Sequence, residues 1–333
     1  MKSVLVIMHQ ALVPPENIKS SEVDRFLTPW VTEYDVISAL KKNKYEIRTL
    51  GIDSDISPLV EEIKNHRPHF VFNLLEQFNN DPAMDYHIVT LLELHGIRYT
   101  GSNPKGLVLA RDKALSKKIL QYHRILTPHF YTLKQNEKFK APHKSMKYPM
   151  IVKCLFEEAS YGIAQKSVVN NLDQLKERVE YIQKTLEQDV IIEEFIEGKE
   201  YYIGVLGNNR LKVLPVWELV YKNVEAPEKE VYTARAKWNK SYRKRKGIDH
   251  QRAKLDKELE ARIIKVVKRT YKALSLSGYA RIDIRVDANQ NIYILEANPN
   301  PNISFDDEFA MSAKNVGLSY KDLIKKVITL SQN

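Results

Sequence analysis

The sequence predicts a protein of mixed α/β and α+β class, with an N-terminal doubly wound parallel-sheet domain ahead of two further units. In residues 1–103, apolar strand-like runs alternate with amphipathic helix-like segments, a pattern that favours a parallel sheet. In residues 104–190, short strand-like runs surround a charged helix, which indicates a small α+β unit with antiparallel character. Residues 191–333 end in two strand-like runs joined by a turn. We therefore expect three domains, at 1–103, 104–190 and 191–333.

Runs rich in β-branched residues predict the strands of the first domain, and apolar residues three or four apart predict its helices. In chain order the elements are a strand at 3–8, a helix at 33–42, a strand at 45–50, a helix at 58–65, a strand at 69–74, a helix at 84–95 and a strand at 97–102 that ends in a turn.

The same rules apply to the remaining chain, where Pro104 suits the first turn of a long helix. The middle domain is predicted to contain a helix at 104–124, strands at 128–133, 149–154 and 163–169, a helix at 172–186 and a strand at 189–195. The last third is predicted to contain strands at 201–207 and 212–220, a helix at 255–275, paired strands at 279–286 and 292–298, and a helix at 319–331.

Composition restricts the class of protein. Hydrophobic residues make up 43% and charged residues 28% of the chain, and no apolar run reaches the roughly 18 residues of a membrane span. Cys154 is the one cysteine, so an internal disulfide is excluded. We expect a cytoplasmic protein with no membrane partner. The net charge of +10 favours anionic partners, and much of it lies in 237–246, which predicts a solvated loop or a contact with polyphosphate or RNA.

The pair of strands near the C-terminus carries the strongest chemical signal. Side chains alternate along a strand, so Arg281, Asp283 and Arg285 share one face, as do Glu296 and Asn298 on the neighbouring strand. If the two strands pair, Asp283, Glu296 and Asn298 converge as hard oxygen ligands of the kind that Mg²⁺ prefers. The alternative is a ladder of cross-strand ion pairs on a solvated face.

Two further segments suggest a nucleotide site. Lys153 ends an apolar run, where a lysine needs an anion, and residues 157–162 form a turn of small and polar residues able to cover phosphates. Segment 190–200 joins an apolar strand to an acidic connector, which suits either an adenosine site or an ordinary acidic turn. The glycine-rich dinucleotide and phosphate-loop motifs are absent, and no zinc-ligand spacing or nucleophile elbow occurs.

Four segments carry a more specific signal when they are taken in order: YTGSNPKGLVLARDKALSKKIL at 99–120, YPMIVKCLFEEASYGI at 148–163, VIIEEFIEGKEYYIGVLG at 190–207 and GYARIDIRVDANQNIYILEANPNPNIS at 278–304. Together they resemble the ATP-grasp enzymes and specifically the D-alanine–D-alanine ligases. The resemblance covers most of 98–304 and extends only in outline to the first domain. It implies an ATP-grasp fold of three parts and a homodimer through the N-terminal domain.

The resemblance also implies residue roles around ATP and two Mg²⁺ ions, for which Mn²⁺ is an alternative. Phosphate contacts would come from Lys113, Lys153 and Lys237, under a lid at 157–162 that contains Ser160 as a catalytic residue. Adenine would be held by Glu193, Glu194, Phe195 and Ile196, and ribose by Glu200. The metal ions would be held by Asp283, Glu296 and Asn298. Arg281 would face the reacting carboxylate, which attacks the γ-phosphate to give an acyl phosphate that an amine then captures.

The sequence departs from the family around both substrates. Asn302 replaces a glycine, and an acidic run at 305–308 stands where the family offers serine to the acceptor's carboxylate. These acids would favour a cation if they line the pocket, or they simply begin the following helix. Glu158 and Ala159 replace the lid's glycine and first serine, and Trp238 replaces its tyrosine. The family's glutamate that binds the amine of the first substrate has no clear match here, although Glu16 or Glu33 could take its place. Asn73-Leu-Leu-Glu76 replaces a Leu-His-Gly turn of the family.

We therefore predict a ligase that joins a small carboxylate, such as an amino acid or peptide, to an amine, with a substrate other than D-alanine. A second hypothesis is an ATP-grasp enzyme that modifies a peptide or protein carboxylate. A third is a nucleotide- or RNA-binding protein without ligase activity. The predicted metal triad argues against this third hypothesis, and nucleic acid is not the expected partner.

Overall fold

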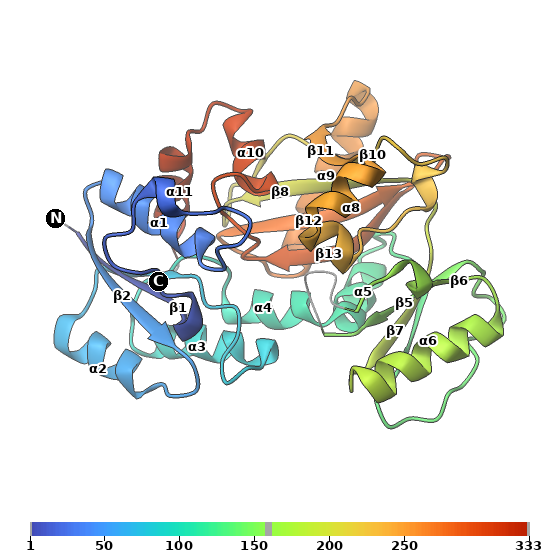
Figure 1. Ribbon diagram of the computed structural model, residues 1–333, viewed down its shortest axis with the longest axis horizontal. Helices are drawn as coiled ribbons and strands as arrows, with labels where there is room; N and C mark the ends of the chain where they lie inside the picture. The colour runs from blue at the N-terminus through green and yellow to red at the C-terminus, as the bar shows by residue number, and fades with distance from the viewer. Residues whose placement is uncertain (1, 157–161, 332–333) are drawn as a thin grey trace.

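Three sheets organise the described residues, 2–156 and 162–331, of this computed structural model (Figure 1). The N-terminal sheet has the order β2-β1-β3, with β1 at Ser3–His9, β2 at Glu46–Ile52 and β3 at Phe70–Asn73, and its pairs are parallel. Helices α1, α2 and α3 span Val31–Lys42, Ser57–His66 and Asp85–Leu94. The predicted parallel unit is therefore confirmed. The strand expected at 97–102 is reduced to one bridge between Val71 and Tyr99, because the chain turns at Gly101, whose φ is +100°.

The connection to the second sheet consists of α4 at Pro104–Arg111 and α5 at Lys113–Tyr122, so the prediction of one helix over 104–124 was wrong. Asp112 interrupts it with an extended backbone, and its carboxylate accepts hydrogen bonds from the amides of Ala114 and Leu115. This side chain satisfies two amides at the start of α5, and it favours a new helix over continuation of the old one.

The central sheet is antiparallel, with the order β4-β7-β5-β6. Its strands are β4 at Phe130–Leu133, β5 at Met150–Cys154, β6 at Val168–Val169 and β7 at Val190–Glu194, and α6 at Leu172–Thr185 packs against it. Only the last two residues of the strand expected at 163–169 are extended in this sheet. The domain boundaries stay predictions. Because β7 pairs with β5 in the central sheet, the boundary between the second and third domains would lie after Glu194 rather than after residue 190.

The largest sheet has the order β11-β10-β8-β12-β13, with β9 paired to β8. Its strands are β8 at Lys199–Leu206, β9 at Lys212–Val213, β10 at Trp217–Tyr221, β11 at Ile248–Arg252, β12 at Tyr279–Val286 and β13 at Ile292–Pro299. Its helices are α7 at Ala234–Trp238, α8 at Lys240–Lys246, α9 at Lys257–Ala273, α10 at Glu308–Lys314 and α11 at Tyr320–Thr329. Short 3₁₀ helices lie at Gln10–Leu12, Ser20–Glu22, Pro82–Met84, Gln165–Ser167 and Pro227–Lys229.

The C-terminal helices return to the N-terminal sheet, as Figure 1 shows by the position of α11 beside α1. One hydrophobic core contains Val4 and Val36 from the first sheet and its helix together with Phe309, Leu323 and Val327 from α10 and α11. Burial of these side chains places the segment just before α10 next to the start of α1. Along the described chain, no helix has the length and apolar character needed to cross a bilayer.

Candidate active site

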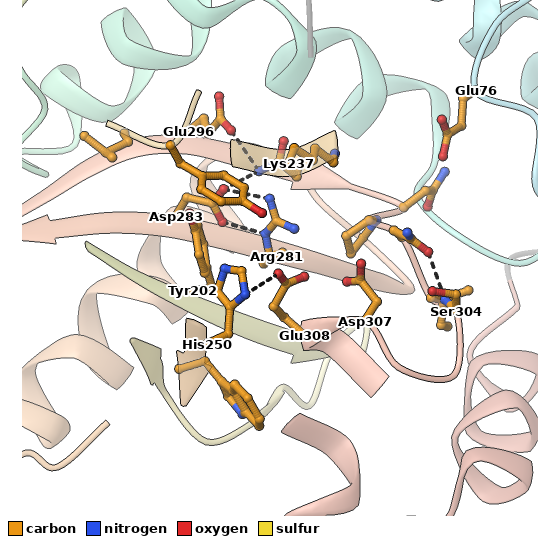
Figure 2. Close-up of a pocket in the computed structure, with 18 of the residues that line it drawn as sticks. Glu76, Tyr202, Lys237, His250, Arg281, Asp283, Glu296, Ser304, Asp307 and Glu308 are labelled. Atoms are coloured by element: carbon orange, nitrogen blue, oxygen red, sulfur yellow. Dashed lines mark hydrogen bonds and ion pairs between the residues drawn. The ribbon is translucent and has the colours of Figure 1, made fainter. Parts of the chain in front are cut away.

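A cavity of about 1050 Å³ lies between the three sheets (Figure 2). Its wall includes these twelve residues from the predicted set: Lys113, Lys153, Glu193, Glu194, Phe195, Ile196, Glu200, Lys237, Arg281, Asp283, Glu296 and Asn298. Ser160 and the substituted lid residues Glu158 and Ala159 lie outside the described residues. The fold therefore brings segments of the sequence nearly 200 residues apart to one cavity, while the role of each residue stays a prediction.

The β12–β13 hairpin has the register on which convergence of the three oxygen ligands depends. Asp283 lies opposite Glu296, and Arg281 lies opposite Asn298. The Asn298 amide donates to Asp283 Oδ2 at 3.0 Å and to Glu296 Oε1 at 3.3 Å, so the three side chains meet. Arg281 donates to both oxygens of Asp283, at 2.7 and 2.9 Å. The predicted convergence on one face is thus present.

The two carboxyl groups of this hairpin differ in their electrostatic surroundings. Burial raises the pKa of Asp283 to about 7, although Arg281 acts in the opposite direction. Burial also opposes charge on Glu296, but the positive charges of Lys113, Lys153 and Arg281 lower its pKa below the usual value. A pair of carboxyl groups with an amide oxygen in a polar cavity is the donor set of a hard divalent cation.

These donors fit Mg²⁺ in kind but do not enclose it. No group of three or more His, Cys, Asp or Glu side chains able to hold a metal occurs within the described parts of the chain. Mg²⁺ is commonly held by one or two carboxylates together with substrate phosphates and waters, so an incomplete protein cage is the expected arrangement. Asp283, Glu296 and Asn298 therefore remain a candidate metal site that phosphates would complete.

A buried ion-pair cluster lies behind this hairpin, and sequence reasoning found only part of it. Glu193 on β7 accepts from Lys153 at 3.0 Å and pairs with Lys117 at 3.1 Å. Burial alone would raise the pKa of Glu193, but the two ammonium groups lower it to about 2. Lys117 also donates to the carbonyl oxygen of Leu295, at 2.5 Å. Sequence reasoning missed Lys117 because one lysine among several on an amphipathic helix has no distinguishing pattern.

The segment expected to hold adenosine is tied to the large sheet by Arg285. The guanidinium donates to Glu200 Oε2 at 3.0 Å and to the carbonyl oxygen of Ile196 at 2.9 Å, and it lies 4.7 Å from the ring centroid of Phe195. The Tyr202 hydroxyl donates to the other oxygen of Glu200, at 2.7 Å. Arg285 is 4% exposed and is itself part of the cavity wall, where it fixes three of the predicted adenosine residues.

The basic run at 237–246 folds into α7 and α8, so the prediction of a loop there was wrong, although Lys240, Lys244 and Arg245 are exposed to solvent. The side chain of Asn239 accepts from the amide of Tyr242 and thereby caps α8. Several of its charges are used inside the molecule, since Lys246 pairs with Glu230 at 2.7 Å and Arg243 donates to the hydroxyl of Tyr232. Lys237 lines the cavity from α7.

The opposite end of the cavity is acidic. Asp306, Asp307 and Glu308 all line it, and Asp307 makes no side-chain capping bond to α10 although it precedes that helix. Glu33 also lines the cavity, together with Glu76 from the segment that follows β3. By contrast, Glu16 is exposed and is not part of the cavity wall. The acidic run therefore contributes to the pocket as well as beginning the helix.

Comparison with known proteins agrees with this fold. Residues 117–329 match the family described as D-ala D-ala ligase C-terminus. The chain is 32% identical over 305 residues to a D-alanine–D-alanine ligase of Carboxydothermus hydrogenoformans, covering 89% of this chain and 90% of that one. It is 30% identical over 301 residues to the uncharacterized protein y4sG of Sinorhizobium fredii, covering 89% and 86%.

A solved structure gives the same result. The D-alanine–D-alanine ligase from Bacillus anthracis complexed with ATP superposes with a TM-score of 0.76 and 25% identity, covering 99% of this chain and 97% of that one. The fold is therefore an ATP-grasp fold, which is the fold of a class of ATP-dependent ligases. Within that class, the chain belongs to the D-alanine–D-alanine ligase family, whose members form carbon–nitrogen bonds.

Proposed function

We propose that this protein is an ATP-dependent, Mg²⁺-requiring ligase that joins a small carboxylate to an amine through an acyl phosphate, with at least one substrate other than D-alanine. The observation that carries the proposal is the convergence of Asp283, Glu296 and Asn298 in one cavity with Lys113 and Lys153. A protein that only bound a nucleotide would not require two carboxyl groups and an amide at the phosphate end.

The nucleotide would lie between the central and the largest sheet. Lys113, Lys153 and Lys237 would neutralise its phosphates, and the segment from Glu194 to Ile196 would bind adenine, with Glu200 at the ribose. Because Glu193 is 1% exposed and holds two lysines, its role would be to orient Lys153 rather than to bind the base. Mg²⁺ held by Asp283, Glu296 and Asn298 would neutralise charge on the transferred phosphoryl group.

The first step would be attack of the substrate carboxylate on the γ-phosphate, which releases ADP and leaves an acyl phosphate. A neutral amine would then attack the acyl carbon, the carbon–oxygen bond to phosphate would break, and the amine nitrogen would lose a proton. Arg281, held by two hydrogen bonds to Asp283, would face the carboxyl group and stabilise its oxyanion. Residues 157–162, with Ser160, would cover the acyl phosphate and exclude water.

The experiment is ADP release from Mg-ATP by the purified chain, challenged with pools of D- and L-amino acids, short peptides, other small carboxylic acids and amines. Stimulated release, with a product whose mass is the sum of two reactants minus water, would establish the ligase. Glu296→Gln should remove this stimulation, while Glu258→Gln on the exposed face of α9 should retain it. Tight ATP binding without release from any pool would contradict a ligase of small substrates.

A further inference from the structure

The end of the cavity beyond Arg281 is lined by carboxyl groups from both ends of the chain. Glu33 comes from α1, Glu76 from the segment after β3, and Asp307 and Glu308 from the start of α10. Figure 2 shows Asp307 and Glu308 pointing toward the space beside Arg281, with Glu76 farther away at the upper right. We call these four residues the acidic end of the cavity.

Arg25, the arginine nearest this end in the N-terminal segment, is already bound by two carboxylates. It donates to Asp35 at 3.0 and 2.7 Å and to Asp306 at 2.8 and 2.6 Å. Both carboxylates are held by the same guanidinium, so its donors are engaged within the wall. Arg25 itself lines the cavity, but the two carboxylates that hold it offset its positive charge.

Glu308 keeps a negative charge at the acidic end, since His250 and the bond to Asp307 lower its pKa to about 2 against the effect of burial, whereas burial raises the pKa of Glu33 to about 7. Glu308 lies 3.0 Å from the imidazole of His250, and burial lowers the pKa of that histidine. Burial and the adjacent charge of Glu308 raise the pKa of Asp307, so these two neighbours hold one proton between them. A ligand with a carboxylate here would meet like charge, whereas an ammonium group would replace the shared proton.

Glu33 provides an independent observation. Its side chain is 4% exposed and lines the cavity, yet its Oε2 atom has no hydrogen-bond partner within the described parts of the chain. A buried carboxyl oxygen without a donor is costly, and native structures rarely retain one unless a ligand or water satisfies it. An ammonium or guanidinium group of a substrate would supply the missing donor.

We infer that the amine substrate carries a second, non-reacting positive charge, as in a diamine, a polyamine or a basic amino acid, and that Asp307 and Glu33 bind this charge. The inference rests on the proposed function, because it names the class of amine that the ligase accepts. The reacting nitrogen attacks as the neutral amine and forms the carbon–nitrogen bond as phosphate leaves. The second nitrogen stays protonated and forms no covalent bond.

Calorimetric titration of the full chain with Mg-ADP present tests the inference without requiring turnover. The probes are 1,4-diaminobutane and butylamine, which have the same carbon chain and differ in one charged nitrogen. The diamine should bind at least about tenfold more tightly, a difference of about 1.4 kcal/mol. Asp307→Asn should remove most of this difference while butylamine binding stays unchanged. Glu61→Gln, on the exposed side of α2, is the matched control and should bind as the wild type does.

Equal affinity for the two probes would overturn the inference, as would a preference that Asp307→Asn and Glu33→Gln both leave intact. ADP binding by each variant reports whether it has folded, and Glu33→Gln replaces Asp307→Asn if the latter fails to fold. The two proposals fail separately. ADP release stimulated by alanine but not by diamines or lysine would keep the ligase and remove the cation site. Charge-dependent diamine binding, with no ADP release from any pair of substrates, would keep the cation site and remove the ligase.

Discussion

Lys117 and Glu193 form an ion pair of 3.1 Å in which each side chain is only 1% exposed. Glu193 bridges Lys117 to Lys153, which is 13% exposed and lines the cavity. A buried lysine loses hydration that only good geometry and further hydrogen bonds can replace, and Lys117 obtains both from Glu193 and from the carbonyl of Leu295. The ion pair therefore fixes Glu193 on β7, and Glu193 in turn positions Lys153, a candidate for binding phosphate.

Lys117→Met should destabilise the protein by about 3 kcal/mol, because removing one partner leaves Glu193 buried with half of its compensating charge. Urea unfolding measured by fluorescence gives this free energy directly. Lys118→Met is the control, since Lys118 is the next residue on the same helix and is exposed. Equal unfolding free energies for the two variants would show that the pair contributes nothing to stability.

Glu296→Gln should weaken binding of Mn²⁺, used as a spectroscopic probe for Mg²⁺, by about 100-fold in the presence of ADP. The substitution keeps the size of the side chain but removes the charge of one of two carboxyl ligands. Electron paramagnetic resonance of free Mn²⁺ measures the affinity, and ADP affinity without metal serves as the folding control. Retention of wild-type Mn²⁺ affinity would remove Glu296 from the metal site and leave the hairpin as an ion-pair ladder.

The hairpin could be predicted from sequence because its chemistry follows from alternation along two adjacent strands, and pairing of Asp283 with Glu296 needs only a local turn. From the sequence, the acidic run before α10 could be assigned to the pocket only as an alternative to a simple helix start. Its position depends on the packing of α11 against α1, which the sequence does not reveal. Arg25 had no sequence signal, since its partner Asp306 lies 281 positions away. The break at Asp112 was missed because a capping aspartate within an otherwise helical pattern is a weak signal.

Glu33→Gln should stabilise the protein above pH 7 by about 3 kcal/mol and change little near pH 4. Burial raises the pKa of Glu33 to about 7, above its usual 4.5. Between pH 4.5 and 7 the native state therefore holds a proton on Glu33 that the unfolded chain has released. The free energy of unfolding falls as pH rises through this range, because charging Glu33 in the native state is unfavourable. Glutamine is neutral at every pH and avoids that loss. Thermal unfolding of the wild type and of Glu33→Gln at pH 4, 6 and 8 measures how their difference in stability grows with pH. A difference that does not change with pH would contradict the raised pKa of Glu33.

Arg25 and Asp35 should show a coupling energy of about 2 kcal/mol in a double-mutant cycle of Arg25→Met and Asp35→Asn. Asp35 is 8% exposed and Arg25 keeps 31% of its side chain exposed, so the coupling should fall below that of a fully buried pair. The matched control is the pair of Arg48 and Glu62, in which Arg48 is 48% exposed and solvent screens the charges. That pair should couple far more weakly.

Arg25→Met should also weaken 1,4-diaminobutane binding while leaving ADP binding intact, because Arg25 holds Asp306 beside Asp307 without touching the nucleotide half of the cavity. A loss of ADP affinity equal to the loss of diamine affinity would mean that Arg25 supports the whole cavity rather than its acidic end.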